Sequence, residues 1–188
     1  TESVDGAMYL GGISGNTCTG SIINNCSSTM NIKCKDTASK WVEGLAVGGI
    51  SGKDLGSQMS NCEYAGSINV DGAASYVGGI AGYYRYEDDN HCVMKQCHSN
   101  ATINLSCTTH DGLSTVSAGG LIGYTTSPII EDCYSEGSVD EQFTGDDESY
   151  PCAGGLIGYC ESDKRDSTID RCYSLCRANC SISTGDPG

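Results

Sequence analysis

Apolar and polar residues alternate along several short segments of this chain. Residues 67–70 (Ser-Ile-Asn-Val) and 102–105 (Thr-Ile-Asn-Leu) both follow a period of two, which places alternate side chains on opposite faces of a β-strand. No stretch of eleven or more residues has a helical apolar face, and the 26 glycines disfavour helix interiors. The pattern therefore predicts an all-β chain with strands of about four to six residues.

The apolar segments recur in one fixed order. The pentapeptide Gly-Gly-(Ile/Leu)-x-Gly occurs five times, at residues 11–15, 48–52, 78–82, 119–123 and 154–158. An Ile or Met follows each copy, and a cysteine follows that residue by three positions. The five repeat cysteines are Cys26, Cys62, Cys97, Cys133 and Cys172, at spacings of 36, 35, 36 and 39 residues. A period in this range is typical of solenoids and other repeat arrays.

Each repeat contains three short apolar segments, which predicts a right-handed parallel β-helix (a β-solenoid) of about five three-strand coils. It would form one domain over residues 1–188, with repeats at approximately 8–34, 45–70, 76–105, 117–139 and 152–182. Equivalent strands would pair about 4.8 Å apart, so that equivalent residues stack in ladders. Inward ladders are predicted for the five repeat cysteines, for the pentapeptide Ile and Leu residues, and for Ile32, Ile68, Ile103, Val139 and Ile182. A β-sandwich or propeller-like array is the alternative geometry.

The fourth repeat resembles a known family. Residues 119–139 contain Gly-Gly-Leu-Ile-Gly, then Ile130, then Cys133-Tyr134-Ser135 and a final Gly-Ser-Val. This order resembles the GLUG-motif repeat family almost residue for residue, and residues 154–174 resemble it nearly as well. The first three repeats match less well, because other residues follow the cysteine in place of Tyr-Ser. The resemblance implies a segment of a large surface-exposed or secreted protein, adhesin-like among others, without catalytic residues. The additional cysteines depart from the usual pattern of the family.

Thirteen cysteines in 188 residues are typical of an oxidising compartment. We expect the five repeat cysteines to be small, buried and reduced. The other eight lie mostly in or beside the expected loops and are candidates for disulfides, with a connectivity that the sequence leaves open. These candidates are Cys18, Cys34, Cys92, Cys107, Cys152, Cys160, Cys176 and Cys180.

The chain is strongly acidic, with 24 acidic and 10 basic residues and a formal net charge of −14. Such a surface argues against nucleic acid and anionic membranes as partners, and no apolar run approaches the 18 residues of a membrane span. The acidic clusters are interpreted as solvated loops, with a calcium site at Asp146, Asp147 and Glu148 as the weaker alternative. No other cofactor is expected, because the histidines and cysteines lack the paired spacing of zinc sites.

Two groups of surface residues are candidates for recognition or modification. Tyr83, Tyr124 and Tyr159 follow the pentapeptide in the last three repeats. They would either pack as a ladder or form an exposed aromatic stripe for sugar or protein contact. Among the Asn-x-(Ser/Thr) sequons, Asn100 and Asn104 are the favoured glycan acceptors.

The sequence contains no Ser/His/Asp arrangement, phosphate-binding loop or dinucleotide fingerprint, so we expect no enzyme activity and no catalytic residues. The predicted function is a non-enzymatic extracellular structural or recognition module, adhesin-like or filament-forming, with disulfide-stabilised loops. Its partners would be a protein or glycan at a cell surface, or copies of itself. The alternative is a carbohydrate-active solenoid enzyme. Because residue 1 is Thr, we expect a mature form or an excised segment of a larger protein.

Overall fold

The computed structural model describes residues 8–35, 45–72, 75–86, 91–108, 115–145, 150–162 and 166–184. Their regular secondary structure consists of 23 strands, without a helix in these ranges. The all-β prediction is therefore confirmed. Among the described residues there is accordingly no helix that is long and apolar enough to cross a membrane.

The strands form four parallel sheets, which we call sheets A to D. Sheet A contains β1 (Met8–Gly11), β6 (Leu45–Gly48), β11 (Ser75–Gly78), β15 (Thr115–Gly119) and β19 (Tyr150–Gly154). Sheet B contains β2 (Ser14–Thr17), β7 (Ser51–Leu55), β12 (Ala81–Arg85), β16 (Ile122–Thr126) and β20 (Ile157–Glu161). Sheet C contains β3 (Ile22–Asn24), β8 (Gln58–Ser60), β13 (Val93–Lys95), β17 (Ile129–Glu131) and β21 (Thr168–Asp170).

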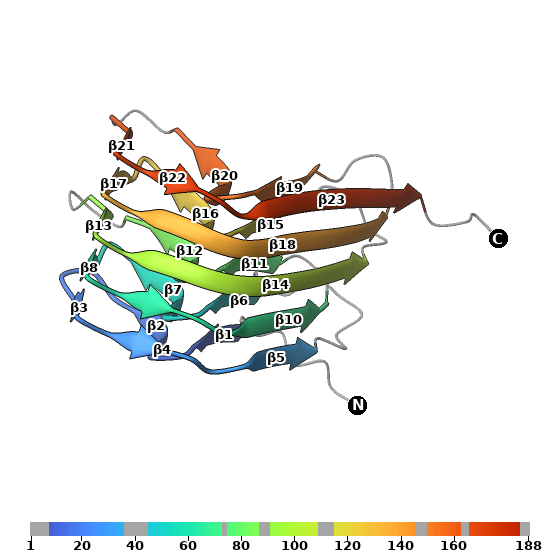
Figure 1. Ribbon diagram of the computed structural model, residues 1–188, viewed down its shortest axis with the longest axis horizontal. Coiled ribbons are helices and arrows are strands. Elements are labelled where there is room, and N and C mark those ends of the chain that lie inside the picture. Colours follow the sequence, from blue (N-terminus) through green and yellow to red (C-terminus); the bar gives the residue numbers. More distant parts are fainter. Residues whose placement is uncertain are drawn as a thin grey trace.

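Sheet D contains the longest strands of the molecule. Its members are β4 (Ser27–Ser28), β5 (Ile32–Lys35), β9 (Glu63–Tyr64), β10 (Ser67–Asp71), β14 (His98–Thr108), β18 (Tyr134–Gly145), β22 (Tyr173–Ser174) and β23 (Arg177–Thr184). In Figure 1 the strands of sheet D lie one above the other, from β5 to β23, in front of the other sheets. Each repeat adds strands to all four sheets, so the chain is a parallel β-solenoid, as predicted; its right-handed sense stays a prediction.

The prediction of three strands per repeat is wrong, because each repeat contributes to four sheets. The pentapeptide forms a sharp corner between a strand of sheet A and a strand of sheet B. In the second repeat, β6 ends at Gly48 and β7 begins at Ser51. A Cβ atom added at Gly49 would lie 2.1 Å from the Gly79 carbonyl oxygen and 2.1 Å from the Tyr64 ring. Only glycine allows this close approach.

The core consists of columns of inward side chains with one member from each repeat. Ile32, Ile68, Ile103 and Val139 pair in register, as predicted. The fifth member of this column is Ala178, and the prediction of Ile182 is wrong. In every repeat the member of this column lies six residues after the repeat cysteine, whereas Ile182 lies ten residues after Cys172. Ile182 instead extends the column of Phe143.

Sheet D is also longer than the repeat boundaries predicted from the sequence. β14 and β18 extend beyond the expected repeat ends at residues 105 and 139. The alternation of buried and exposed residues continues to the end of β14, with Cys107 buried and Ser106 and Thr108 exposed. The strands therefore continue past both predicted repeat ends, to Thr108 in β14 and to Gly145 in β18.

Candidate recognition surface

The tyrosines that follow the pentapeptide form a packed column on sheet B. Tyr83, Tyr124 and Tyr159 are in register, with ring centroids 4.9 Å and 5.6 Å apart. Tyr76 of sheet A packs against the rings of Tyr83 and Tyr124 at 5.4 Å and 5.0 Å. Tyr124 is only 8% exposed, whereas Tyr159 is 36% exposed. The faces of the Tyr83 and Tyr124 rings are therefore covered by neighbouring rings.

Hydroxyl contacts add to the packing of this column. The Tyr124 hydroxyl donates to the Glu161 carboxylate, and the Arg85 guanidinium donates to the Tyr83 hydroxyl at 3.4 Å. Burial raises the pKa of both Tyr76 and Tyr124. Of the three tyrosines predicted as binding candidates, only Tyr159 offers substantial surface.

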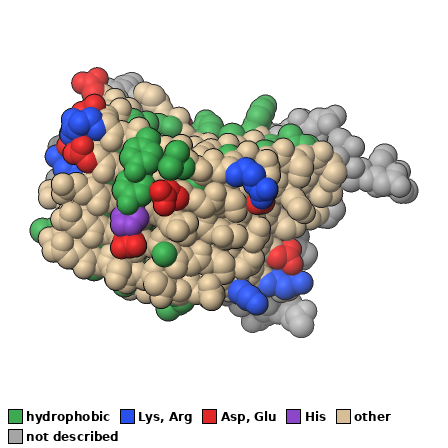
Figure 2. Space-filling view, viewed as in Figure 1, with side chains coloured by type: hydrophobic (Ala, Val, Ile, Leu, Met, Phe, Trp, Pro, Cys, Tyr) green, Lys and Arg blue, Asp and Glu red, His purple; other side chains and the backbone are tan. Residues whose placement is uncertain are grey.

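A second aromatic column lies on the outer face of sheet D and is more open. Glu63, His98, Tyr134 and Tyr173 occupy equivalent positions directly after the repeat cysteines. The His98 and Tyr134 rings stack with centroids 4.8 Å apart, and the Tyr134 and Tyr173 rings stack at 5.0 Å. His98 Nε2 lies 3.1 Å from Glu63 Oε1, and Tyr173 is 52% exposed. On this face, Figure 2 shows hydrophobic side chains beside a histidine, with acidic side chains next to them.

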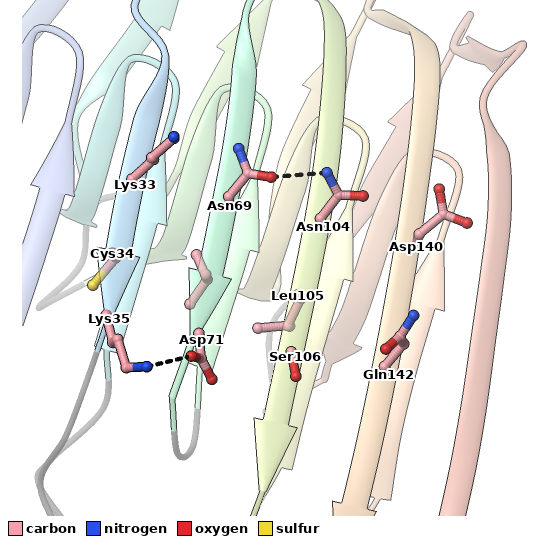
Figure 3. Close-up of a pocket in the computed structure, with 11 residues that line it drawn as sticks. Lys33, Cys34, Lys35, Asn69, Asp71, Asn104, Leu105, Ser106, Asp140 and Gln142 are labelled. Carbon is pink, nitrogen blue, oxygen red and sulfur yellow. Dashed lines mark hydrogen bonds and ion pairs between the residues drawn. The ribbon is translucent and has the colours of Figure 1, made fainter.

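An open groove of about 420 Å³ lies further along the same face. One row of its side chains contains Lys33, Asn69, Asn104 and Asp140, which are in register across four strands (Figure 3). Asn104 Nδ2 donates to Asn69 Oδ1 at 2.9 Å. Two residues further along the same strands, Lys35 of β5 pairs with Asp71 of β10 at 3.2 Å. The groove therefore offers amide, carboxylate and ammonium groups at the regular spacing of the strands.

The five repeat cysteines form the corner between sheets C and D. Each Sγ contacts the backbone carbonyl oxygen two residues earlier, at 3.2–3.4 Å. The residue before each cysteine has a positive φ of 50–55°, and these residues are Asn25, Asn61, Gln96, Asp132 and Arg171. The thiol is a small group that fits the core and can donate weakly to the carbonyl exposed by this turn. Sequence reasoning missed this contact; the Asn and Asp residues before the cysteines were its only signal.

The middle repeat cysteines are fully buried and lie next to one another. Cys62, Cys97 and Cys133 have no exposed surface, whereas Cys26 and Cys172 in the outer repeats are half-buried. The Cys97 backbone N–H donates to Cys133 Sγ at 3.3 Å. Hydrogen bonding of the Cys97 thiol with Cys133 and Cys62, and then burial, raise the pKa of Cys97. Its thiol therefore stays protonated at neutral pH.

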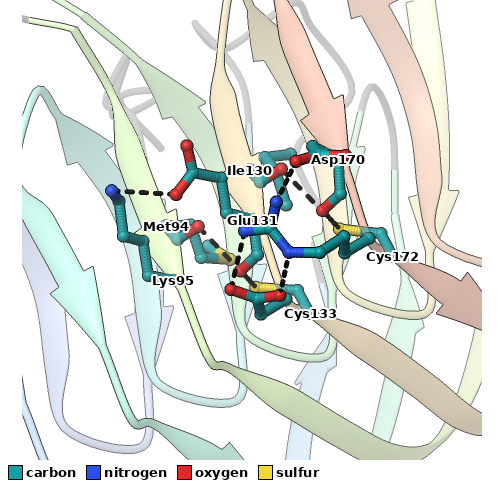
Figure 4. A network of polar contacts seen from close by, with 9 residues as sticks. Met94, Lys95, Ile130, Glu131, Cys133, Asp170 and Cys172 are labelled. Atoms are coloured by element: carbon teal, nitrogen blue, oxygen red, sulfur yellow. Dashed lines mark hydrogen bonds and ion pairs between the residues drawn. The ribbon is translucent and has the colours of Figure 1, made fainter.

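Ion pairs reinforce the same corner on the outside of the last repeats (Figure 4). The Arg171 guanidinium binds both oxygens of Asp132, at 2.5 Å and 2.9 Å, and also contacts Asp170. Hydrogen bonds from Arg171 lower the pKa of Asp132. Between the neighbouring strands β13 and β17 of sheet C, Lys95 pairs with Glu131 at 2.9 Å. These contacts join successive repeats along the solenoid axis.

The eight disulfide candidates lie in different environments. Cys34, Cys92 and Cys107 are buried in the core, Cys152 and Cys176 are half-buried, and Cys18, Cys160 and Cys180 are exposed. All thirteen cysteines lie in the described residues, and no disulfide joins any of them there, so the disulfide prediction finds no support. The expectation that these cysteines lie mostly in or beside loops is wrong, because five of the eight belong to strands: Cys34 to β5, Cys107 to β14, Cys152 to β19, Cys160 to β20 and Cys180 to β23.

Two buried carboxylates have unlike surroundings. Asp54 accepts hydrogen bonds from the Ser57 backbone N–H at 2.9 Å and from the Ser57 hydroxyl at 2.6 Å. Glu141 is 1% exposed, and its carboxylate oxygens have no hydrogen-bond partner among the described residues. Burial raises the pKa of Glu141 to about 7, and the nearby backbone N–H groups of Ala118 and Cys152 offset this only in part.

The remaining candidates concern modification and metal binding. Asn100 and Asn104 both lie on β14 with exposed side chains on the outer face of sheet D. The calcium candidates Asp146, Asp147 and Glu148 lie outside the described residues. Within the described ranges, no group of three or more His, Cys, Asp or Glu residues could hold a metal ion.

The fold and these columns define a protein of the parallel β-solenoid repeat class. Comparison with protein families gives one match, in which residues 114–140 fit the GLUG motif. The chain therefore carries a GLUG motif, and the resemblance noted on the sequence is confirmed over the fourth repeat. No curated protein and no solved structure matched the chain.

Proposed function

We propose that this chain is a non-enzymatic structural and recognition module of an extracellular or cell-surface protein, and that it binds protein or glycan through the outer face of sheet D. The observation that carries the proposal is that an open aromatic column and a polar groove share one face of one sheet. Rigid strands hold both features, so binding there requires little ordering of the protein.

The chemistry of this face suits sugars and polar peptides. Aromatic rings bind apolar ring faces, and the amide and carboxylate groups of Asn69, Asn104 and Asp140 bind hydroxyl and N–H groups. The groove contains both signs of charge, with Lys33 and Lys35 near Asp71 and Asp140. The net charge of −14 disfavours polyanionic ligands, nucleic acid among them.

An extracellular setting is favoured by the cysteine content and by the positions of the sequons. Thirteen cysteines are more typical of secreted chains than of cytosolic ones. Asn100 is accessible on β14, as a glycan acceptor must be. Disulfides would then form only after local rearrangement or between molecules.

The experiment is a glycan array and a cell-surface protein pull-down, followed by titration of the best ligand with two variants. Tyr134→Ala is expected to weaken binding about tenfold or more, because the central ring of the column is lost. Asn104→Ala should weaken binding through the groove. Tyr159→Ala removes an exposed tyrosine of sheet B and serves as the matched control, with no expected change in affinity.

Circular dichroism and thermal unfolding of each variant separate loss of binding from loss of fold. The proposal is wrong if Tyr159→Ala weakens binding while folded Tyr134→Ala and Asn104→Ala do not. A polysaccharide cleavage screen tests the non-enzymatic part, and reproducible cleavage by the purified chain would overturn it.

A further inference from the structure

Two tyrosines of the open aromatic column on sheet D are stacked face to face. Tyr134 of β18 and Tyr173 of β22 are in register, their ring centroids are 5.0 Å apart, and their ring planes differ by 2°. Neighbouring parallel strands lie about 4.8 Å apart, so the register of the backbone brings the two rings together. The sheet therefore holds two phenols from different repeats in contact.

Both phenols point away from the core. Ser135 is fully buried, whereas its neighbour Tyr134 is half-buried, as expected for a strand whose successive side chains face opposite sides of the sheet. Tyr173 occupies the equivalent register position and therefore faces outward as well. A further repeat stacked on the fifth would cover one face of the Tyr173 ring, but the outward edges of both rings would still face solvent. The accessibility of this pair thus does not depend on where the chain ends.

The other tyrosines in ring contact belong, among the described residues, to one enclosed cluster on sheets A and B. Tyr83 and Tyr124 stack at 4.9 Å with planes that differ by 3°, but Tyr76 packs against both rings. Tyr124 is only 8% exposed, and its hydroxyl already donates a hydrogen bond. Two tyrosine pairs of nearly equal ring spacing therefore differ in their freedom to move and in their access to solvent.

From this arrangement we propose that Tyr134 and Tyr173 form a site of oxidative modification, at which a peroxide-driven one-electron oxidant couples the two phenol rings into a dityrosine cross-link. Each ring loses one electron and its hydroxyl proton and becomes a phenoxyl radical. The two radicals pair to form one carbon–carbon bond between ring carbons ortho to the oxygens. The hydrogen on each bonded carbon then moves through water to the phenol oxygen, which restores both aromatic rings.

The balance of this reaction is closed by the peroxide. The two tyrosines lose two electrons and two protons in total, which convert one molecule of hydrogen peroxide into two molecules of water. The step requires no ligand on the recognition face, so it is independent of the binding role proposed above.

The fold favours coupling within one molecule over coupling between molecules. Reacting groups that are held in contact behave as if each were present at a very high local concentration. The new bond also requires the ring planes to turn relative to each other, and side chains on an open face change rotamer rapidly. In the cluster around Tyr124, the rings of Tyr76 and Tyr83 block such a turn.

The cross-link would tie the fourth repeat to the fifth. Positions 134 and 173 are 39 residues apart, and a covalent link that closes a loop restricts the unfolded chain more than the folded one, as a disulfide does. Repeats in a solenoid contact only their neighbours, so the effect should concern the last two repeats. We expect the cross-link to raise their Tm by roughly 10 °C.

The test uses the 188-residue chain after its accessible thiols have been blocked with iodoacetamide, so that the oxidant acts on phenols. Hydrogen peroxide and a haem peroxidase are added at several protein concentrations. The monomer should become two hydrogen atoms lighter and gain dityrosine fluorescence, at a rate per molecule that is independent of protein concentration. Mass spectrometry of the digested product should locate the bond between Tyr134 and Tyr173.

Three variants identify the site. Tyr134→Phe and Tyr173→Phe keep a stacked ring but remove one phenol, so each should abolish the cross-link and the rise in Tm while circular dichroism shows an intact fold. Tyr83→Phe removes a phenol from the enclosed cluster and is the matched control, with an unchanged yield. A cross-link retained in folded Tyr173→Phe, products formed only between molecules, bonds located at Tyr124, or no dityrosine at all would each overturn the proposal.

Discussion

At the scale of single residues, the turn before each repeat cysteine imposes a backbone conformation that not every residue tolerates. Gln96 has a φ of 52° at the position where Asn25 and Asn61 occur in the earlier repeats. Asn adopts this left-handed region at a lower cost than Gln. We predict that Gln96→Asn raises the free energy of unfolding by roughly 0.5–1 kcal/mol, measured by urea denaturation. Thr102→Asn, in the middle of β14, is the control; an equal gain there would contradict the explanation.

The buried Glu141 makes stability depend on pH. Its pKa is raised by burial from 4.5 to about 7 in the folded chain, so between these values the folded state keeps a proton that the unfolded state has released. The free energy of unfolding should therefore fall as pH rises from about 4.5 to about 7, by up to roughly 3 kcal/mol. Urea denaturation across this pH range measures the effect.

Glu141→Gln is expected to remove most of this pH dependence and to stabilise the chain above pH 7. Asp54 also has a raised pKa, because of burial, and would leave a smaller dependence of the same sign. Asp140→Asn changes the outward neighbour on β18 and is the control. An unchanged pH profile in Glu141→Gln would show that water reaches the Glu141 carboxylate in the folded state.

The sequence predicted residue positions better than residue roles. Spacing alone placed the five repeat cysteines in equivalent positions, because stacking preserves the distance along the chain. It did not predict the contact between each thiol and a carbonyl, because an apolar pattern carries no information on hydrogen bonds. The open column of Glu63, His98, Tyr134 and Tyr173 was not recognised as one surface, since its members differ in chemical type.

At the scale of elements, the glycine corner between sheets A and B is the least tolerant part of each repeat. A Cβ atom at Gly49 would collide with backbone and with the buried Tyr64 ring. We predict that Gly49→Ala costs roughly 3 kcal/mol or more, seen as a large decrease in the urea midpoint or as insoluble protein. Gly20→Asn is the control, because Gly20 has a φ of 79° and no atom within 4 Å of an added Cβ. Equal losses in both variants would contradict the steric explanation.

The same corner explains where element prediction failed. Each repeat was predicted to contain three strands, but a strand lies on either side of the glycine corner, so that each repeat contributes to four sheets. Sequence periodicity cannot detect such a corner, because the direction of the chain changes without a polar interruption. The six-residue offset from the repeat cysteine would have identified Ala178 as the column member, but an alanine carries a weaker apolar signal than Ile182.

At the scale of the whole molecule, the repeat period was sufficient to predict a parallel solenoid, because only stacking allows every repeat to bury its apolar face. The sequence did not show which face remains open for binding. That depends on whether outward side chains cover one another, as Tyr76 and Tyr83 do on sheets A and B, or stand apart, as in the groove of sheet D. Side-chain packing of this kind follows from three-dimensional register and not from the linear pattern.

The direction of the backbone hydrogen bonds has a mechanical consequence. All pairs between repeats run along the stacking direction (Figure 1), so tension between the first and last repeats pulls on the ladders one repeat at a time. Stretching of the chain in a force spectrometer should give successive events, each releasing a repeat of about 35 residues and about 120 Å of contour length. A single rupture that releases the whole chain would contradict this expectation. Such stepwise extension would limit the tension that a bound surface experiences.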